Sequence, residues 1–434
     1  MDRQKNVLAR LGLHRRELRA WALYDLANSA FATTIITAIF PVYFTSVAGA
    51  DLAPGAATQL LARTTTIALA TSAVLAPFLG ALADYAPIKK RLLGLFAAIG
   101  CIAAGCLALV MRGDWLLAAV CFGVGNVGFT ASLTFYDSLL PHIAGSDEID
   151  RVSTGGFALG YLGGGVLLAL NVAWILSPAS FGLRDAGQAS RLSFASVALW
   201  WFVFSLPLFR HVPEPATRAG RTARSTASLI RASFGGLLQT IRELRRYRDA
   251  LLLLIAFVIY ADGIGTIQRL ATSYGAELGI DQGALITAIL LVQFAGVPFA
   301  FLFGIVASRI GAKASIFVGL GVYIVLTVSA YYMKTERDFY VLALMVATVQ
   351  GGTQALSRSL FASMIPKARS SEFFGFFSIF EKFGAILGPA VFELASRTSG
   401  SSRSAILSVV VFFVAGAAVL AFVNVKEGQA AVQN

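Results

Sequence analysis

Three polar side chains recur at helical spacing inside a long apolar stretch in the second half of the sequence. Asp262, Thr266 and Arg269 are separated by four and then three residues, so a helix would carry them on one face. Ionisable groups near the middle of such a stretch are costly, and they usually mark the path of an ion or a solute. We therefore predict a substrate or proton site here. The alternative is an internal ion pair that braces the protein.

A second polar stripe consists of Gln350, Gln354 and Arg358, which follow one another at intervals of four residues. A polar stripe on a helix that cannot face lipid usually lines a cavity, so a substrate or proton site is also predicted here. Arg358 lies at nearly the same depth as Glu381 in the next apolar stretch, with Lys382 beside it. Because a lone buried guanidinium is very costly, we expect Arg358 to pair with Glu381. The pattern is equally consistent with a permanent brace and with a gate.

Asp25 interrupts the first apolar stretch about one helical turn from its start. Asn28 follows it at helical spacing on the same side. The expected partners of Asp25 are the basic ends of neighbouring helices, or a cation or ammonium group of a substrate. Pairing or gating and direct contact with a substrate or proton both remain open at this point.

Asn126 and Asp137 lie on one side of a further predicted helix in the first half of the chain. Asp137 is at the end of that helix, level with Asp84 and with a basic run. The basic run consists of Lys89, Lys90 and Arg91. The expected role of Asp137 is to latch a gate electrostatically, with opposite charges that bind weakly enough to separate again.

The composition shows what elements must carry these residues. The 434-residue chain is 57% hydrophobic and 13% charged, whereas about 25% of the residues of soluble domains are charged. A membrane-crossing helix needs about 20 mostly apolar residues. Twelve stretches meet this condition, near 21–47, 59–83, 92–111, 115–139, 154–176, 190–209, 250–275, 283–307, 314–333, 338–365, 373–396 and 403–424. The sequence therefore predicts an all-α integral membrane protein that the lipid bilayer surrounds.

The longest connection, 210–249, divides the predicted spans into two sets of six. The expected organisation is a tail over 1–20, a bundle over 21–209, a linker over 210–249, a bundle over 250–424 and a tail over 425–434. The linker is basic, and its apolar residues recur at helical spacing, which predicts an amphipathic helix on an anionic leaflet or a simple tether. Lys and Arg are concentrated in the connections on the side of the N-terminus, so both termini are expected to be cytoplasmic.

The two halves resemble each other in sequence. "SLLPHIA" at 138–144 ends the fourth span and "SMIPKAR" at 363–369 ends the tenth, while "GALADYAPIKKR" at 80–91 has a weaker copy, "GIVASRIGAK", at 304–313. Such repeats predict two pseudo-symmetric six-helix bundles. Transporters built in this way bind their substrate between the halves.

Several function classes are not expected. The net charge is +12, and the basic residues cluster in short segments between the spans. This distribution indicates contact with a membrane surface and argues against a nucleic-acid partner. The three cysteines have no metal-ligand spacing, and neither a phosphate-binding G-x-x-x-x-G-K-[ST] motif nor a plausible catalytic Ser/His/Asp set occurs. We therefore expect no metal, no cofactor, no ATP-driven transport and no enzyme. The three histidines fall in connections, so a proton relay would have to use carboxylates.

The segment from Gly80 to Asp84, followed by the basic run, resembles the loop signature of the major facilitator superfamily, although Ser308 replaces the acid in the second copy. Three further stretches narrow the resemblance. They are "YDLANSAFATTIITAIFPVYF" (24–44), "YADGIGTI" (260–267) and "QGGTQALSRSLFASMIP" (350–366) with "EFFGFFSIFEKFGAILGP" (372–389). These stretches are similar to the vacuole-effluxer branch, which includes fungal vacuolar amino-acid exporters and bacterial relatives.

The resemblance implies the major facilitator fold, solute transport, and a place for Asp84 and the basic run in the latch. We expect a secondary transporter of a small polar or zwitterionic solute, with Asp262 and Arg269 holding its ammonium and carboxylate ends. A coupling proton, a bacterial inner membrane and a monomer are further expectations. A non-transporting receptor or scaffold and a transporter of a larger amphipathic or lipid-like substrate are the alternatives.

Overall fold

The computed structural model describes residues 7–53, 55–216, 247–384 and 387–433, and these residues form helices and no strand. The first half contains α2 (Arg16–Ala30), η1 (Phe31–Ala38), α3 (Phe40–Tyr43), η2 (Phe44–Ala48), α4 (Ala56–Tyr85), α5 (Lys89–Leu107), α6 (Trp115–Ile143), α7 (Ile149–Leu176), η3 (Pro178–Phe181) and α8 (Ala186–His211). The second half contains α10 (Arg248–Glu277), α11 (Gln282–Ile310), α12 (Ala312–Tyr331), α13 (Glu336–Ser363), η5 (Lys367–Arg369), α14 (Ser370–Gly384), α15 (Leu387–Ser399), α16 (Ser402–Ile406), η6 (Leu407–Val409), α17 (Val410–Ala421) and α18 (Val425–Gln433).

The described helices account for the predicted spans. Ten are long and apolar enough to cross a membrane, and an eleventh span is the bent pair Arg16–Ala38 and Phe40–Ala48, with an angle of 40°. Pro41 lies at this bend and lacks the N–H that would continue the helical hydrogen bonds. The remaining predicted span, 373–396, corresponds to α14 and α15, which lie on either side of residues 385–386. The predicted all-α membrane fold is confirmed.

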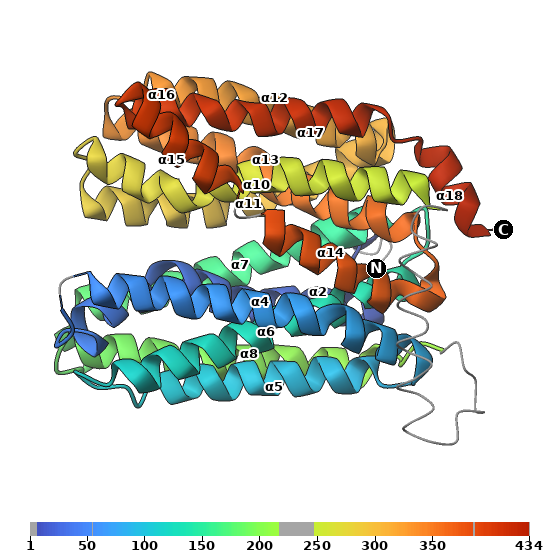
Figure 1. The fold of residues 1–434 in the computed structure, drawn as a ribbon. Coiled ribbons are helices and arrows are strands. Elements are labelled where there is room, and N and C mark those ends of the chain that lie inside the picture. Colours follow the sequence, from blue (N-terminus) through green and yellow to red (C-terminus); the bar gives the residue numbers. More distant parts are fainter. Residues whose placement is uncertain (1–6, 54, 217–246, 385–386, 434) are drawn as a thin grey trace.

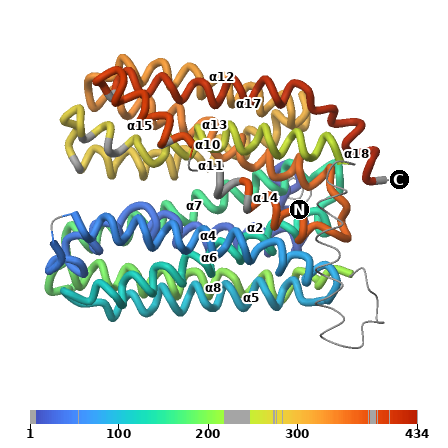
Figure 2. Tube along the Cα trace, in the orientation of Figure 1, coloured from blue at the N-terminus to red at the C-terminus, as the bar shows by residue number. Residues whose placement is uncertain are grey.

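The helices form two bundles (Figure 1). The first bundle contains α2 and α4–α8, the second contains α10–α13 and α15–α17, and α14 lies between them. The tube view shows the same division as a blue-to-green half and a yellow-to-red half (Figure 2). The bundles meet where α7 packs against α11 and α13, and where α14 packs against α4 and α6. Both ends of the chain lie at the same end of the bundles, which we call the termini side.

A run of glycines allows α7 to approach α2 closely. A Cβ atom at Gly160 would lie 2.7 Å from the Ser29 hydroxyl oxygen, and one at Gly163 would lie 2.3 Å from the Leu26 carbonyl oxygen. Small residues at such an interface let two helices pack backbone to backbone in a membrane. The glycines of "GGFALGYLGGG" therefore position α2, which carries Asp25, against α7.

Each bundle has a lysine that closes the end of its last helix. Lys90 Nζ, at the start of α5, donates to the Val212 carbonyl at the end of α8 at 2.5 Å. Lys313 Nζ, at the start of α12, donates to the Val423 carbonyl beyond α17 at 2.7 Å. Carbonyls at a helix C-terminus lack intrahelical donors, so a cation is favoured there. We call these two contacts the lysine clips. The amphipathic segment predicted within the linker lies mostly in 217–246, outside the described residues.

Candidate functional site

The carboxylate of Asp262 contacts the backbone of α15. Asp262 is near the middle of α10 and is 3% exposed. Its Oδ2 accepts a hydrogen bond of 2.6 Å from the backbone N–H of Gly388, in the first turn of α15. A hydrogen bond to a charged acceptor is stronger than one between neutral groups. This contact therefore joins α10 to α15 through the Asp262 carboxylate.

Thr266 and Arg269 accompany Asp262 on the same face of α10. The Thr266 hydroxyl donates to the Asp262 carbonyl at 2.7 Å. Arg269 Nη2 lies 3.7 Å from Asp262 Oδ1, and the Arg269 side chain is 45% exposed. Asp262 Oδ1 receives no hydrogen bond within the described ranges. The structure therefore brings together an acid with one available acceptor oxygen and an accessible base.

Arg358 of α13 binds residues of the first bundle. Its Nη1 lies 2.9 Å from Asp137 Oδ1 and 3.5 Å from Asp25 Oδ2. Its Nε donates to the Ser153 hydroxyl at 2.9 Å and its Nη2 to the Ser153 carbonyl at 3.0 Å. Arg358 is 5% exposed and Asp25 is 8% exposed, so this network is buried at the seam between the bundles.

Two expectations concern this network. Arg358 was expected to pair with Glu381, and among the described side chains the carboxylates beside it belong to Asp25 and Asp137. The side chains of Glu381 and Lys382 lie outside the described residues. Asp137 was expected to latch a gate electrostatically at the level of Asp84, and its Oδ1 accepts from Arg358 of the other bundle. A comparison of depths along helices could not show that Asp25 and Asp137 of the opposite bundle lie beside Arg358.

Three aromatic rings surround the guanidinium of Arg358. Its Cζ lies 4.9 Å from the ring centroid of Trp21, 5.6 Å from that of Tyr136 and 4.6 Å from that of Phe157. Cation–π attraction operates within about 6 Å of a ring centroid. We call these three residues the aromatic cage. The residue types alone gave no sign of the cage, because its rings come from α2, α6 and α7.

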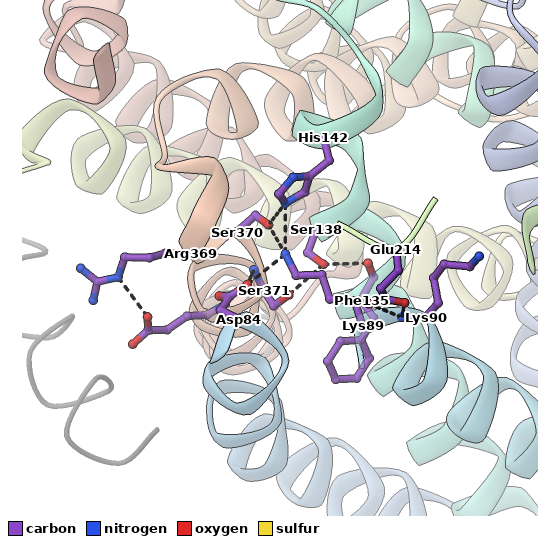
Figure 3. Close-up of polar contacts among 11 residues, drawn as sticks. Asp84, Lys89, Lys90, Phe135, Ser138, His142, Glu214, Arg369, Ser370 and Ser371 are labelled. Carbon is purple, nitrogen blue, oxygen red and sulfur yellow. Dashed lines mark hydrogen bonds and ion pairs between the residues drawn. The ribbon is translucent and has the colours of Figure 1, made fainter. Parts of the chain in front are cut away.

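A second polar network joins the bundles on the termini side (Figure 3). Asp84, at the end of α4, lies 2.9 Å from Lys89 Nζ. Its two carboxylate oxygens accept from the backbone N–H groups of Ser371 and Glu372, at 3.2 and 2.8 Å. Both N–H groups belong to the first turn of α14, so Asp84 of the first bundle caps a helix from the second half of the chain.

Side chains extend this contact, which we call the termini-side latch. Lys89 Nζ donates to the Ser370 hydroxyl at 2.7 Å and lies 3.1 Å from His142 Nε2. The Ser371 hydroxyl donates to that of Ser138 at 3.1 Å. Asp84 and Lys89 are 2% and 3% exposed. The structure is therefore a conformation that is closed at the termini side.

The other members of the basic run lie apart from the latch. Lys90 forms one of the lysine clips, and its backbone N–H donates to the Glu214 carboxylate at 3.1 Å. Arg91 is exposed. The motif thus divides into Asp84 and Lys89, which bind the second half of the chain, and Lys90, which closes its own bundle.

The four predicted amide side chains do not gather in one cluster. The side chain of Gln350 hydrogen-bonds Tyr161 of α7, and Gln354 is half-buried. Asn126 Nδ2 donates to the Phe122 carbonyl of its own helix at 3.4 Å. Asn28 is buried, and its Nδ2 has no hydrogen-bond acceptor among the described residues.

Comparison with known proteins agrees with this architecture. A family model described as "Vacuole effluxer Atg22 like" matches residues 56–433. The chain belongs to the Atg22-like vacuole effluxer family. The MFS-type transporter YxiO of Bacillus subtilis is 36% identical to it over 410 residues, which cover 94% of this chain and 95% of the relative. Autophagy-related protein 22-1 of Aspergillus niger is 25% identical over 298 residues, or 64% of this chain and 48% of the fungal protein. This chain thus matches about half of the length of that fungal relative.

Solved structures identify the fold. The proton:xylose symporter XylE matches with a TM-score of 0.69 and 14% identity, over 94% of this chain and 95% of the symporter. The human organic anion transporter MFSD10 matches with a TM-score of 0.68 and 13% identity, over 94% of this chain and 99% of that one. Likeness at these identities concerns the fold, which is that of the major facilitator superfamily (MFS). The family resemblance seen in the sequence is confirmed, and the chain is an integral membrane protein of the MFS transporter type.

Proposed function

We propose that this Atg22-like protein is a secondary active transporter that moves a small polar or zwitterionic solute, such as an amino acid, by alternating access. The observation that carries the proposal is the Asp262–Arg269 pair, with 3.7 Å between Oδ1 and Nη2, near the middle of α10. An acid and a base this close together match the two ends of a zwitterion. Asp262 Oδ1 would accept from the ammonium group, and Arg269 would bind the carboxylate.

The contacts that close the termini side also support the proposal of alternating access. Alternating access requires the bundles to separate where they are now in contact, so the termini-side latch and the Arg358 network have to break. We infer from the excess of Lys and Arg in the connections that this side faces the cytoplasm of a bacterial cell and that both termini lie there. The functional unit is then a monomer in the inner membrane, because each substrate path lies between the bundles of one chain.

A proton is the proposed coupling ion, and Asp262 is its proposed carrier. A protonated Asp262 would lose its charge, so its attraction to the Gly388 N–H and to Arg269 would weaken. Proton binding and solute binding would then both act on the contacts that Asp262 forms with Arg269 and with the Gly388 N–H. This coupling follows from the position of the carboxylate on the Gly388 N–H.

The proposed function is tested with purified protein in vesicles. A metabolite library is first screened for solutes that raise the apparent melting temperature, because a ligand that binds the folded state stabilises it. Uptake and counterflow of each hit are then measured in proteoliposomes. Asp262→Asn should abolish uptake while the yield and melting temperature of the protein stay close to those of the wild type.

Glu393→Gln is the matched control. Glu393 forms an exposed pair with Arg397 in α15, so losing its charge should change neither uptake nor stability by much. Normal uptake by Asp262→Asn would show that Asp262 is not part of the site. Failure of every solute in the library to cross the membrane would count against the proposed substrate class.

A further inference from the structure

The polar partners that the structure describes for Arg358 all lie across the seam. Within the described part of the chain, they are Asp25 of α2, Asp137 of α6 and Ser153 of α7. Arg358 itself belongs to α13 of the second bundle. Any motion that separates the bundles on the termini side therefore takes the guanidinium away from this whole set of partners.

The aromatic cage, in contrast, belongs to one bundle and stays assembled. Trp21 and Tyr136 stack with their centroids 4.4 Å apart, and the Trp21 indole donates to the Tyr136 carbonyl at 3.0 Å. Trp21 and Tyr136 are fully buried. Gly156 leaves room for the guanidinium, because a Cβ there would lie 2.9 Å from Asp25 Oδ2 and 3.3 Å from Arg358 Nη2. The cage and Asp25 thus form a preformed cation site that Arg358 now fills.

Withdrawal of Arg358 would leave this site in an unfavourable state. Asp25 is 8% exposed, and Arg358 is the cation that acts on it. Removing one partner from a buried ion pair leaves an uncompensated charge, which is strongly destabilising. A replacement positive charge is therefore needed in the conformation that opens at the termini side. A proton would neutralise Asp25 but would leave the three ring faces without a partner, whereas an organic cation would satisfy both.

We propose that the aromatic cage, together with Asp25, is a second cation-binding site, which takes the ammonium or guanidinium group of the transported solute when Arg358 withdraws. The inference rests on the proposed alternating-access function. It adds to that function a substrate class, solutes with an organic cationic group, and a contact made nearer to the termini side than Asp262. It also gives Arg358 the role of a competitor that closes the site when no solute is present.

The test is chemical rescue of Arg358→Ala. Removing the guanidinium empties the site, so the variant should melt below the wild type. Methylguanidinium or tetramethylammonium at millimolar concentration should then raise its melting temperature saturably by at least about 2 °C, whereas sodium at equal ionic strength should not. The double variant Asp25→Asn/Arg358→Ala should lose this response. No saturable response of Arg358→Ala to either organic cation would overturn the proposal.

Arg369→Ala is the matched control. It tests whether an organic cation stabilises any variant from which a buried arginine has been removed. Arg369 is also buried and paired, at 3.1 Å from Glu372, and its Cζ lies 5.8 Å from the ring centroid of Phe373, farther than Arg358 lies from any ring of the cage. An equal response in this variant would show that the rescue is generic, and the proposal would fail. A response of Arg358→Ala to lower pH alone would also overturn it, because a proton would then replace Arg358. The groups that could titrate there are Asp25, Asp137 and Tyr136, with Asp150 nearby on α7.

A measurement on the wild type covers the case in which Arg358→Ala does not fold. Methylguanidinium should give the wild-type protein a smaller saturable shift, and Phe157→Leu, which removes one ring, should abolish it. An equal shift in Phe157→Leu would contradict the cage. These readouts need no transport, so they separate the two proposals. Transport without any cation response overturns only the cage, and a cation response in a protein that moves no solute overturns only the proposed function.

Discussion

Gly388 determines where the carboxylate of Asp262 can lie. A Cβ at this position would be 1.9 Å from the Thr266 hydroxyl oxygen and 2.9 Å from Asp262 Oδ1. Gly388→Ala should therefore push α15 away from α10 and break the hydrogen bond to Asp262. We expect uptake to fall at least about tenfold, because about 1.4 kcal/mol of lost binding energy corresponds to that factor. Uptake in proteoliposomes is the measurement, with the melting temperature taken alongside.

Gly321→Ala is the control for this change. Gly321 lies within α12, and a Cβ there would meet no heavy atom within 4 Å. The same substitution should leave uptake unchanged and stabilise the helix slightly. If Gly388→Ala behaves like Gly321→Ala, the contact between α10 and α15 does not position Asp262. The double variant Thr266→Ala/Gly388→Ala should recover part of the loss, since it removes the closer of the two clashing atoms.

The sequence predicted some of these residues and could not predict others. Spacing alone placed Asp262, Thr266 and Arg269 on one face, because a single helix fixes their relation. The partners of Arg358 come from another bundle, and nothing local in the sequence encodes that approach. Gly388 was visible as one glycine of "GAILGP", but its contact with Thr266 depends on how α15 meets α10.

Two glycines control how closely the bundles meet at the scale of helices. A Cβ at Gly80 of α4 would lie 2.3 Å from the Ser371 carbonyl oxygen of α14. A Cβ at Gly304 of α11 would lie 2.2 Å from the Thr154 hydroxyl oxygen of α7. These two seams are related by the repeat that the sequence shows at 80–91 and 304–313. The first obstructing atom is backbone and the second is a side chain, so α4 and α14 have less freedom to adjust.

Gly80→Ala should therefore favour the conformation that is open at the termini side more strongly than Gly304→Ala does. A cysteine at Ser138, which is buried beneath α14, reports the opening when the native cysteines are replaced. Its maleimide labelling should be several-fold faster with Gly80→Ala, because each 1.4 kcal/mol shifts the population about tenfold. Slower or unchanged labelling would contradict the role of this seam.

The helices themselves followed closely from composition. Runs of about 20 apolar residues must be helical in hydrocarbon, so the spans were predictable. The bend of the first span could be traced to Pro41, which the sequence displays.

The two halves of the molecule are similar in fold but not in chemistry. Asp84 binds the first turn of α14, whereas its counterpart Ser308 donates to the Ile305 carbonyl within its own helix. At this position of the repeat, the first half therefore supplies a carboxylate to the seam and the second half a hydroxyl. The repeat predicted the pseudo-symmetry, and the replacement of the acid by serine predicted this loss. What the sequence could not supply was the partner of Asp84, which lies 288 positions further along the chain.

The lysine clips have a practical consequence for following the molecule in motion. They tie the segment after α8 to the first bundle and the segment after α17 to the second, so spin labels there would move with different bundles. Labels on cysteines placed at the exposed positions Pro213 and Phe422 should show a shorter distance in this conformation than when solute drives the termini side open. A label pair at Pro213 and Arg91, both held by the first bundle, should keep one distance throughout. The constant distance within the first bundle thus serves as an internal reference for the distance changes between the bundles during the transport cycle.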